Sequence, residues 1–101
     1  MDVANLIVIE RQRQLQKFDA DHDDVLTHGE LLSGAFAYLC VPGDDLWPTD
    51  LAHYRPSRDP VRNLVRAGAL IAAEGDRLLR RQLTQLEAYL KENNGHQSIV
   101  H

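Results

Sequence analysis

The feature that most constrains the fold is a long helical pattern that begins at Asp59 and Pro60. Aspartate is a favoured N-cap residue, and proline is favoured in the first turn of an α-helix. No proline follows, and the next strong stop signal is the Asn-Asn-Gly run at 93–95. We therefore predict a helix over residues 60–91, roughly 46 Å long at 1.5 Å per residue. Because such a helix is longer than a domain of this size is wide, its second half should either protrude or break and fold back.

Two shorter helical patterns precede it, over residues 3–18 and 28–40. Thr27 and Glu30 have the spacing of a capping box, which predicts the start of the second helix. This helix carries one apolar stripe, formed by Leu31, Leu32, Ala35, Phe36 and Leu39. No strand pattern occurs, so the predicted class is all-α. We expect a three-helix bundle with a long C-terminal helix, a single domain over 1–92 and a flexible tail over 93–101.

The loop over residues 41–59 separates the second helix from the third. All four prolines and the only tryptophan lie between residues 41 and 60. Loops of this length in compact domains are more often functional than idle. Trp47 and Tyr54 are expected to hold the loop against the body by burying aromatic surface. Together with Asp44 and Asp45 they are also the candidate partner-binding residues.

The third helix has two distinct segments. Small residues dominate 67–75, where they would let another helix approach closely. Beyond them, leucines follow one another at four-three-four spacing, which is typical of a short coiled-coil seam. This seam predicts self-association, and hence a homo-oligomer, through Leu79, Leu83, Leu86 and Leu90.

Composition excludes several classes of protein. The chain has one cysteine, which excludes an internal disulfide, and no apolar run long enough to span a bilayer. It lacks a standard secretory signal, so we expect a reducing, cytoplasmic location in a host cell. The net charge of −4 argues against bulk nucleic-acid binding.

Charge is strongly segregated along the chain. No lysine or arginine occurs within 18–54, whereas arginines are frequent from Arg55 onward. The two halves could neutralise each other across an internal interface. Alternatively, an acidic cation site could face an arginine-lined anion site.

The acidic residues suggest two candidate metal sites. The segment 19–30 has the oxygen ligands of a calcium loop at the required positions, although Asp24 replaces the usual glycine of the turn. Its ligands would be Asp19, Asp21, Asp23, Val25 through its carbonyl, Thr27 and Glu30. The alternative interpretation is a polar turn in which Thr27 and Glu30 only cap a helix.

The second candidate is an acidic cluster with one glutamate from each helix, which could hold Ca²⁺ or Mg²⁺. Its members are Glu10, His22, Asp23, Asp24, Glu30 and Glu74. Glu74 points along an apolar helical face, where a carboxylate must be paired or must coordinate a cation. Arg77, three residues further on, is the obvious partner for a salt bridge, and Arg13 has the same spacing from Glu10.

Several ordered motifs resemble a family of small phage and prophage proteins. They are IERQRQ at 9–14, HDDVLTHGELLSGAFAYL at 22–39, WP at 47–48 and YRPSRDPVRNLVRAGALIAAEGDRLLR at 54–80. The resemblance covers most of 9–81 and implies phage origin and a helical fold, but no reaction. The matching positions are Glu10, Arg11, His22, Asp23, Asp24, Gly29, Glu30, Trp47, Pro48, Gly68 and Glu74. The family usually has other residues at positions 19 and 21, so Asp19 and Asp21 are not among the matching positions.

A looser resemblance links the chain to the MazG-like all-α nucleotide pyrophosphohydrolases. It implies that Glu30 and Glu74 hold magnesium while arginines grip a nucleotide phosphate. The paired glutamate spacing of those enzymes is absent, because Ser33 follows Glu30 and Arg77 follows Glu74 at the third position.

The leading hypothesis is a non-enzymatic, phage-derived accessory protein that binds a host or phage macromolecule as an inhibitor or regulator. A metal-dependent nucleotide pyrophosphohydrolase and a calcium-binding module are the alternatives. No residue is assigned a catalytic role.

Overall fold

The computed structural model describes residues 1–17, 23–49, 51 and 54–100 and shows an all-α chain. Its three longer helices are α1 (Val3–Lys17), α3 (Glu30–Leu39) and α4 (Pro60–Val100), and a short 3-10 helix, η1, spans Asp44–Leu46. Both α1 and α3 pack against α4, and no strand occurs in the described residues. The predicted three-helix architecture is confirmed.

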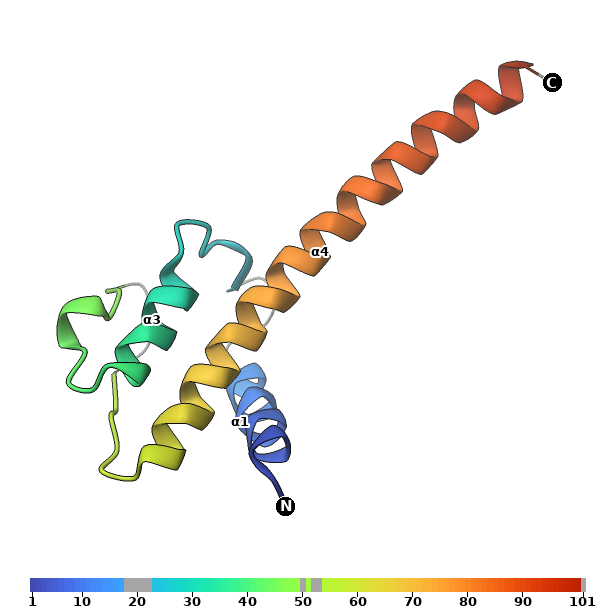
Figure 1. The fold of residues 1–101 in the computed structure, drawn as a ribbon. Coiled ribbons are helices and arrows are strands. Elements are labelled where there is room, and N and C mark those ends of the chain that lie inside the picture. The colour runs from blue at the N-terminus through green and yellow to red at the C-terminus, as the bar shows by residue number, and fades with distance from the viewer. Residues whose placement is uncertain (18–22, 50, 52–53, 101) are drawn as a thin grey trace.

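Helix α4 is the axis of the molecule. The side chain of Asp59 caps it, accepting a hydrogen bond from the backbone N–H of Val61 at 3.0 Å, as predicted. Its first half runs through the body, and its second half extends away from α1 and α3 without breaking (Figure 1). The molecule is therefore elongated, measuring 65 × 32 × 21 Å along its principal axes.

The predicted end of α4 is wrong. The helix does not stop at Lys91 but continues through the Asn-Asn-Gly run to Val100, so most of the expected flexible tail is helical. Glycine and asparagine lower helix propensity by about 1 kcal/mol or less each. Such a cost weakens a helix without terminating it.

The start of α3 also differs from the prediction. The helix begins at Glu30 rather than at His28, because Gly29 adopts a left-handed backbone with φ of 81°. Glycine takes this conformation without a steric penalty. The predicted capping box is therefore wrong: Gly29, not Thr27, is the N-cap residue and makes no side-chain cap hydrogen bond, and the Glu30 carboxylate instead accepts a hydrogen bond from the His28 N–H at 2.9 Å.

The buried face of α3 is not the predicted stripe. Leu31, Gly34, Ala35, Ala37 and Tyr38 are buried, whereas three members of the stripe are exposed: Leu32, Phe36 and Leu39. The small residues of α3 let its neighbours come close. A Cβ atom added at Gly34 would lie 3.2 Å from Leu70 of α4 and 2.7 Å from Leu51 of the loop. The face of α3 that is buried is therefore the one whose small residues let α4 and the loop come close, not the one with the most large apolar side chains.

An aromatic cluster holds the proline-rich loop against α3. Trp47 stacks on Tyr54 with ring centroids 5.1 Å apart and meets Tyr38 edge-on at 5.4 Å. The Tyr54 hydroxyl donates to the Ala37 carbonyl at 2.8 Å and accepts from the Gly43 N–H at 3.0 Å. Trp47 and Tyr54 thus anchor the loop to the core as predicted.

Candidate functional site

Glu74, the acid on the apolar face of α4, is buried and paired with an arginine. Its side chain is 6% exposed, that of Arg77 is 9% exposed, and the Arg77 Nε donates to Glu74 Oε1 at 2.6 Å. The two residues are one turn apart on the same helix. The predicted Glu74–Arg77 salt bridge is confirmed, and the burial on which the prediction depended is confirmed with it.

Arg77 also acts on the second glutamate proposed for a metal site. The pKa of Glu30 lies below its usual value, mainly because its own backbone N–H and that of His28 donate to the carboxylate. The charges of His28 and Arg77 lower it further. Arg77 is thus salt-bridged to Glu74 and makes a smaller electrostatic contribution at Glu30.

A second ion-pair network joins three segments of the chain. Arg11 on α1 donates from Nη2 to Asp23 at 3.1 Å and from Nε to Asp76 on α4 at 3.4 Å. Arg11 and Asp23 are buried, with whole-residue exposures of 9% and 4%. No sequence pattern indicates the Arg11–Asp23 pair, because residues 12 positions apart in different segments share no periodic spacing.

The remaining charge pairs are more exposed. Arg80 on α4 donates to Asp24 at 2.8 Å, and this contact raises the already high pKa of Arg80. It is the one described ion pair that links the acidic segment 18–54 to the basic half beyond it, and it supports internal neutralisation at that point. Arg13 pairs with Glu10 through Nε at 3.0 Å, as the spacing predicted.

The described members of the acidic cluster do not converge on a common centre. Within the described ranges, no three side chains of histidine, cysteine, aspartate or glutamate are grouped so that they could hold a metal. Glu10, Asp23, Asp24 and Glu74 each pair with an arginine instead. His22, the sixth member, lies outside the described residues.

The predicted calcium loop is only partly described. Asp19 and Asp21 lie outside the described residues, so ligation by these two stays a prediction. Asp23, the third ligand, is engaged by Arg11, and Glu30, the last, is engaged by the His28 N–H. Val25 is 72% exposed, and Thr27 is exposed as well. In the described part, this segment is a turn held by the Arg11–Asp23 ion pair and by the hydrogen bond from the His28 N–H to Glu30.

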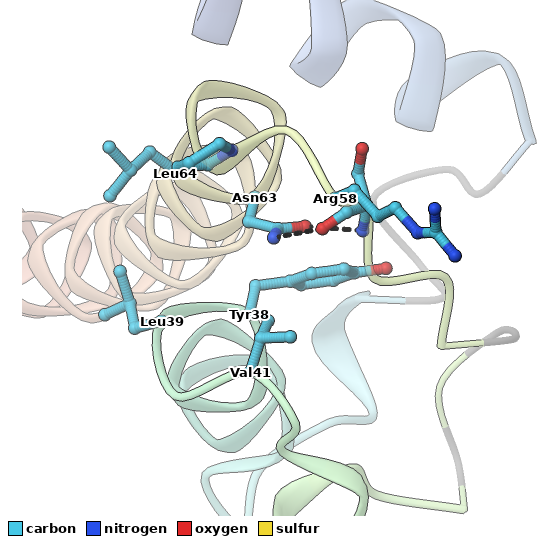
Figure 2. A pocket seen from close by; sticks show the side chains of 8 residues that line it. Tyr38, Leu39, Val41, Arg58, Asn63 and Leu64 are labelled. Atoms are coloured by element: carbon cyan, nitrogen blue, oxygen red, sulfur yellow. Dashed lines mark hydrogen bonds between the residues drawn. The ribbon is translucent and has the colours of Figure 1, made fainter.

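Apolar side chains, by contrast, are widely exposed. Leu32, Phe36 and Leu39 of α3 are exposed, as are Leu64, Ile71 and Leu78 of α4. Leu39 and Leu64 border an open pocket of about 560 Å³ between the end of α3 and the start of α4. In Figure 2 both leucines point to the same side, away from Asn63 and Arg58.

Asn63, which the sequence analysis missed, is a structural part of this pocket. It is buried, donates from Nδ2 to the Ser57 carbonyl and accepts from the Ser57 N–H, both at 2.8 Å. These two bonds, drawn in Figure 2, tie the loop to the first turn of α4. An asparagine on the buried side of a predicted helix is the signal that could have identified it.

The leucine seam begins at Leu79, where α4 leaves the body, and continues along the protruding half of the helix. Exposures of its residues are 52% for Leu79, 48% for Leu83, 51% for Leu86 and 48% for Leu90. Tyr89, beside the seam, is 60% exposed. Every residue from Arg81 to Glu92 is exposed, so this part of the helix is not covered by the body.

The predicted partner-binding residues of the loop divide into two pairs. Trp47 and Tyr54 are half-buried in the aromatic cluster, while Asp44 and Asp45 are exposed on η1. Partner binding through these four residues stays a prediction.

The chain matches no protein-family model, and no curated protein or solved structure is significantly similar to it. In the part of the chain that the structure describes, no helix has an apolar stretch suited to crossing a bilayer.

Proposed function

We propose that the protein is a non-enzymatic helical binding protein that self-associates through the leucine seam of α4. The observation that carries this proposal is the seam itself: four half-exposed leucines on one helix that extends beyond the body. Contiguous exposed apolar side chains of this kind are typical of interaction surfaces. Their four-three-four spacing is that of helix–helix pairing.

The ion pairs support a binding role over catalysis. A carboxylate that holds a metal must be free to offer its oxygens to the ion. Glu74 instead makes a short, buried contact with Arg77, and Asp23 is held by Arg11. Recruiting Glu74 to a metal would leave the buried Arg77 guanidinium without its salt-bridge partner, which is costly.

The motif resemblance adds the wider biological role. Small phage proteins without an enzymatic site commonly act by occupying a macromolecule of the host or of the phage. A self-associating chain with the further exposed apolar residues of α3 and α4 suits an inhibitor or regulator of that type. Phage origin and the second macromolecule are parts of this proposal that rest on the resemblance.

Self-association is tested by light scattering and sedimentation over a range of protein concentrations. We expect the mass to rise toward twice that of the chain as concentration increases. Leu86→Lys places a charge in the seam and should keep the protein monomeric. Ala88→Lys is the matched control, because it adds the same charge at an exposed position on the opposite side of the helix. A monomer at all concentrations, or equal effects of the two variants, would contradict the proposal.

Catalysis is tested separately with the wild-type protein. Incubation with a panel of nucleoside triphosphates and either Mg²⁺ or Mn²⁺ should release neither phosphate nor pyrophosphate. Release that depends on the metal and is abolished by Glu74→Gln would favour the pyrophosphohydrolase alternative instead.

A further inference from the structure

We propose that the pocket between the end of α3 and the start of α4 binds a segment of a partner protein, a peptide that carries large apolar side chains next to carboxylates. The inference rests on the binding role proposed above and names the chemistry of the partner. Two observations carry it: the lining of the pocket, and the arginines around it that have no described carboxylate as a partner.

The pocket has an apolar end and a cationic end. Leu39 and Leu64 form the apolar end, and both are about half exposed, at 47% and 50%. Arg58 lines the other end, and in Figure 2 the ring of Tyr38 and the amide of Asn63 lie between it and the leucines. The volume of about 560 Å³ falls within the range of about 300–1,000 Å³ that is typical of ligand sites. A ligand that spans this pocket therefore needs an apolar group at one end and an anionic group at the other.

Contacts within the chain hold the pocket in shape. Asn63 is bonded through both amide atoms to the backbone of Ser57, and the Tyr38 hydroxyl accepts from the Arg55 N–H at 3.2 Å. The guanidinium of Arg66 lies over the Tyr38 ring, 5.9 Å from its centroid, and donates to the Arg55 carbonyl. Because these contacts already fix the pocket, binding requires little further ordering of the protein.

The segment that borders the pocket is basic, although the protein as a whole is acidic. Residues 55–66 contain four arginines and one aspartate, a net charge of +3, whereas the whole chain carries −4. The arginines are Arg55, Arg58, Arg62 and Arg66. The aspartate, Asp59, uses its carboxylate to cap α4 through the Val61 N–H. An acidic ligand would therefore meet a local excess of positive charge.

These four arginines differ from most arginines elsewhere in the chain. Ion pairs with carboxylates engage four of the others: Arg11, Arg13, Arg77 and Arg80. Within residues 1–17, 23–49, 51 and 54–100, no carboxylate forms an ion pair with an arginine of the 55–66 segment. Charge complementarity thus favours a ligand that brings its own carboxylates.

A partner protein suits this pocket better than a second copy of the chain. The seam already provides one two-fold contact between copies, and a second two-fold contact through the pocket would link dimers into open chains. Leu64 lies about 22 Å from Leu79 along the axis of α4. A partner protein can therefore occupy the pocket while the seam pairs.

Fluorescence polarisation with synthetic peptides tests the inference. The probe is a short fluorescein-labelled peptide in which leucine and phenylalanine precede two glutamates, and two lysines replace the glutamates in the control peptide. We expect the acidic peptide to bind with a dissociation constant in the micromolar range, and to bind less tightly as the salt concentration rises. The lysine peptide should bind at least about tenfold more weakly, because its charges repel the arginines.

Two pairs of variants locate the binding site. Arg58→Glu should weaken binding of the acidic peptide about tenfold, whereas Arg81→Glu, at an exposed position outside the pocket, should leave it unchanged. Leu64→Ser should also weaken it about tenfold, whereas Ile71→Ser, at a position 48% exposed and outside the pocket, should not. All four side chains are exposed, so circular dichroism at 222 nm should show an unchanged helical fold.

Three results would overturn the inference: no measurable binding of the acidic peptide, equal binding of the lysine peptide, or equal effects of the pocket variants and their controls. A loss of self-association in Arg58→Glu, measured by light scattering, would overturn it as well, because the occupant would then be a second copy.

Peptide binding to Leu86→Lys separates this inference from the proposed self-association, because that variant alters the seam and keeps the pocket. We expect it to bind the acidic peptide as tightly as the wild type does. Peptide binding by a wild-type protein that stays monomeric at all concentrations would support the inference and refute self-association alone.

Discussion

The buried pair of Glu74 and Arg77 makes the clearest energetic prediction. Both side chains are less than a tenth exposed, and their contact is 2.6 Å. Breaking a buried ion pair by removing one partner costs about 3–5 kcal/mol, because the remaining charge is left uncompensated. We expect Glu74→Gln to destabilise the fold by about 3 kcal/mol, at the lower end, since the nearby charge of Glu30 still compensates Arg77 in part. A chain of this size has about 5–15 kcal/mol of stability in total.

The double variant provides the decisive comparison. Removing both charges, with Glu74→Leu and Arg77→Met, leaves no unpaired ion and should be close to neutral in stability. A double-mutant cycle built from these two substitutions should therefore show a coupling of at least about 2 kcal/mol. The free energy of unfolding is measured by urea denaturation, followed by circular dichroism at 222 nm, a standard helical signal.

The Glu10–Arg13 pair is the matched control. It has the same spacing on a helix, but the Arg13 side chain is 54% exposed. Exposed pairs of this kind couple by about 0.2–1 kcal/mol. Equal coupling in the two pairs would refute the argument that burial makes Glu74 dependent on Arg77. A stabilising Glu74→Gln would refute it too, and would indicate a carboxylate held in place for chemistry.

Three further predictions follow from other parts of the structure. Gly43→Ala should destabilise the protein by about 1–3 kcal/mol in urea denaturation, since its Cβ would lie 2.6 Å from a backbone Cα of α3. Gly75→Ala, which meets nothing within 4 Å, should instead stabilise α4 by about 0.5–1 kcal/mol. Glu30 has a lowered pKa, so its stabilising contribution is complete above pH 4.5 and is lost as the pH falls through its folded pKa. Unfolding measured at pH 7 and pH 3.5 should accordingly show a smaller loss of stability for Glu30→Gln than for the wild type.

Local patterns predicted the helices and the local ion pairs well. The Asp59–Pro60 start and the Glu74–Arg77 bridge each depend on residues within one turn of each other. Periodicity alone could not show which face of α3 is buried. Gly34 and Ala35 allow closer contact than the leucine stripe does, and that advantage exists only once α4 and the loop are in place.

Local sequence patterns could not predict the contacts between segments that lie far apart in the chain. Arg11 joins Asp23 and Asp76, which are 12 and 65 positions away from it. The left-handed backbone of Gly29 is a similar case: the Thr27–Glu30 spacing predicts a helix start at His28, whereas the structure has Gly29 as the N-cap and the helix start at Glu30. In both cases the outcome depends on how the helices are placed against one another.

Because α4 is one continuous helix, the way its inner half packs in the body also sets the directions in which the side chains of its outer half point. One rigid helix bears both the core residue Ala73 and the leucine Leu86, so the direction in which Leu86 faces is set by the packing of the body. Deleting a single residue between Ala73 and Leu86 would rotate the outer part of α4 by about 100° about the helix axis. Leu86 would then face a different direction relative to the body. Selection that keeps the core residues of α4 in their buried positions therefore also keeps the exposed leucines of the seam pointing in one direction.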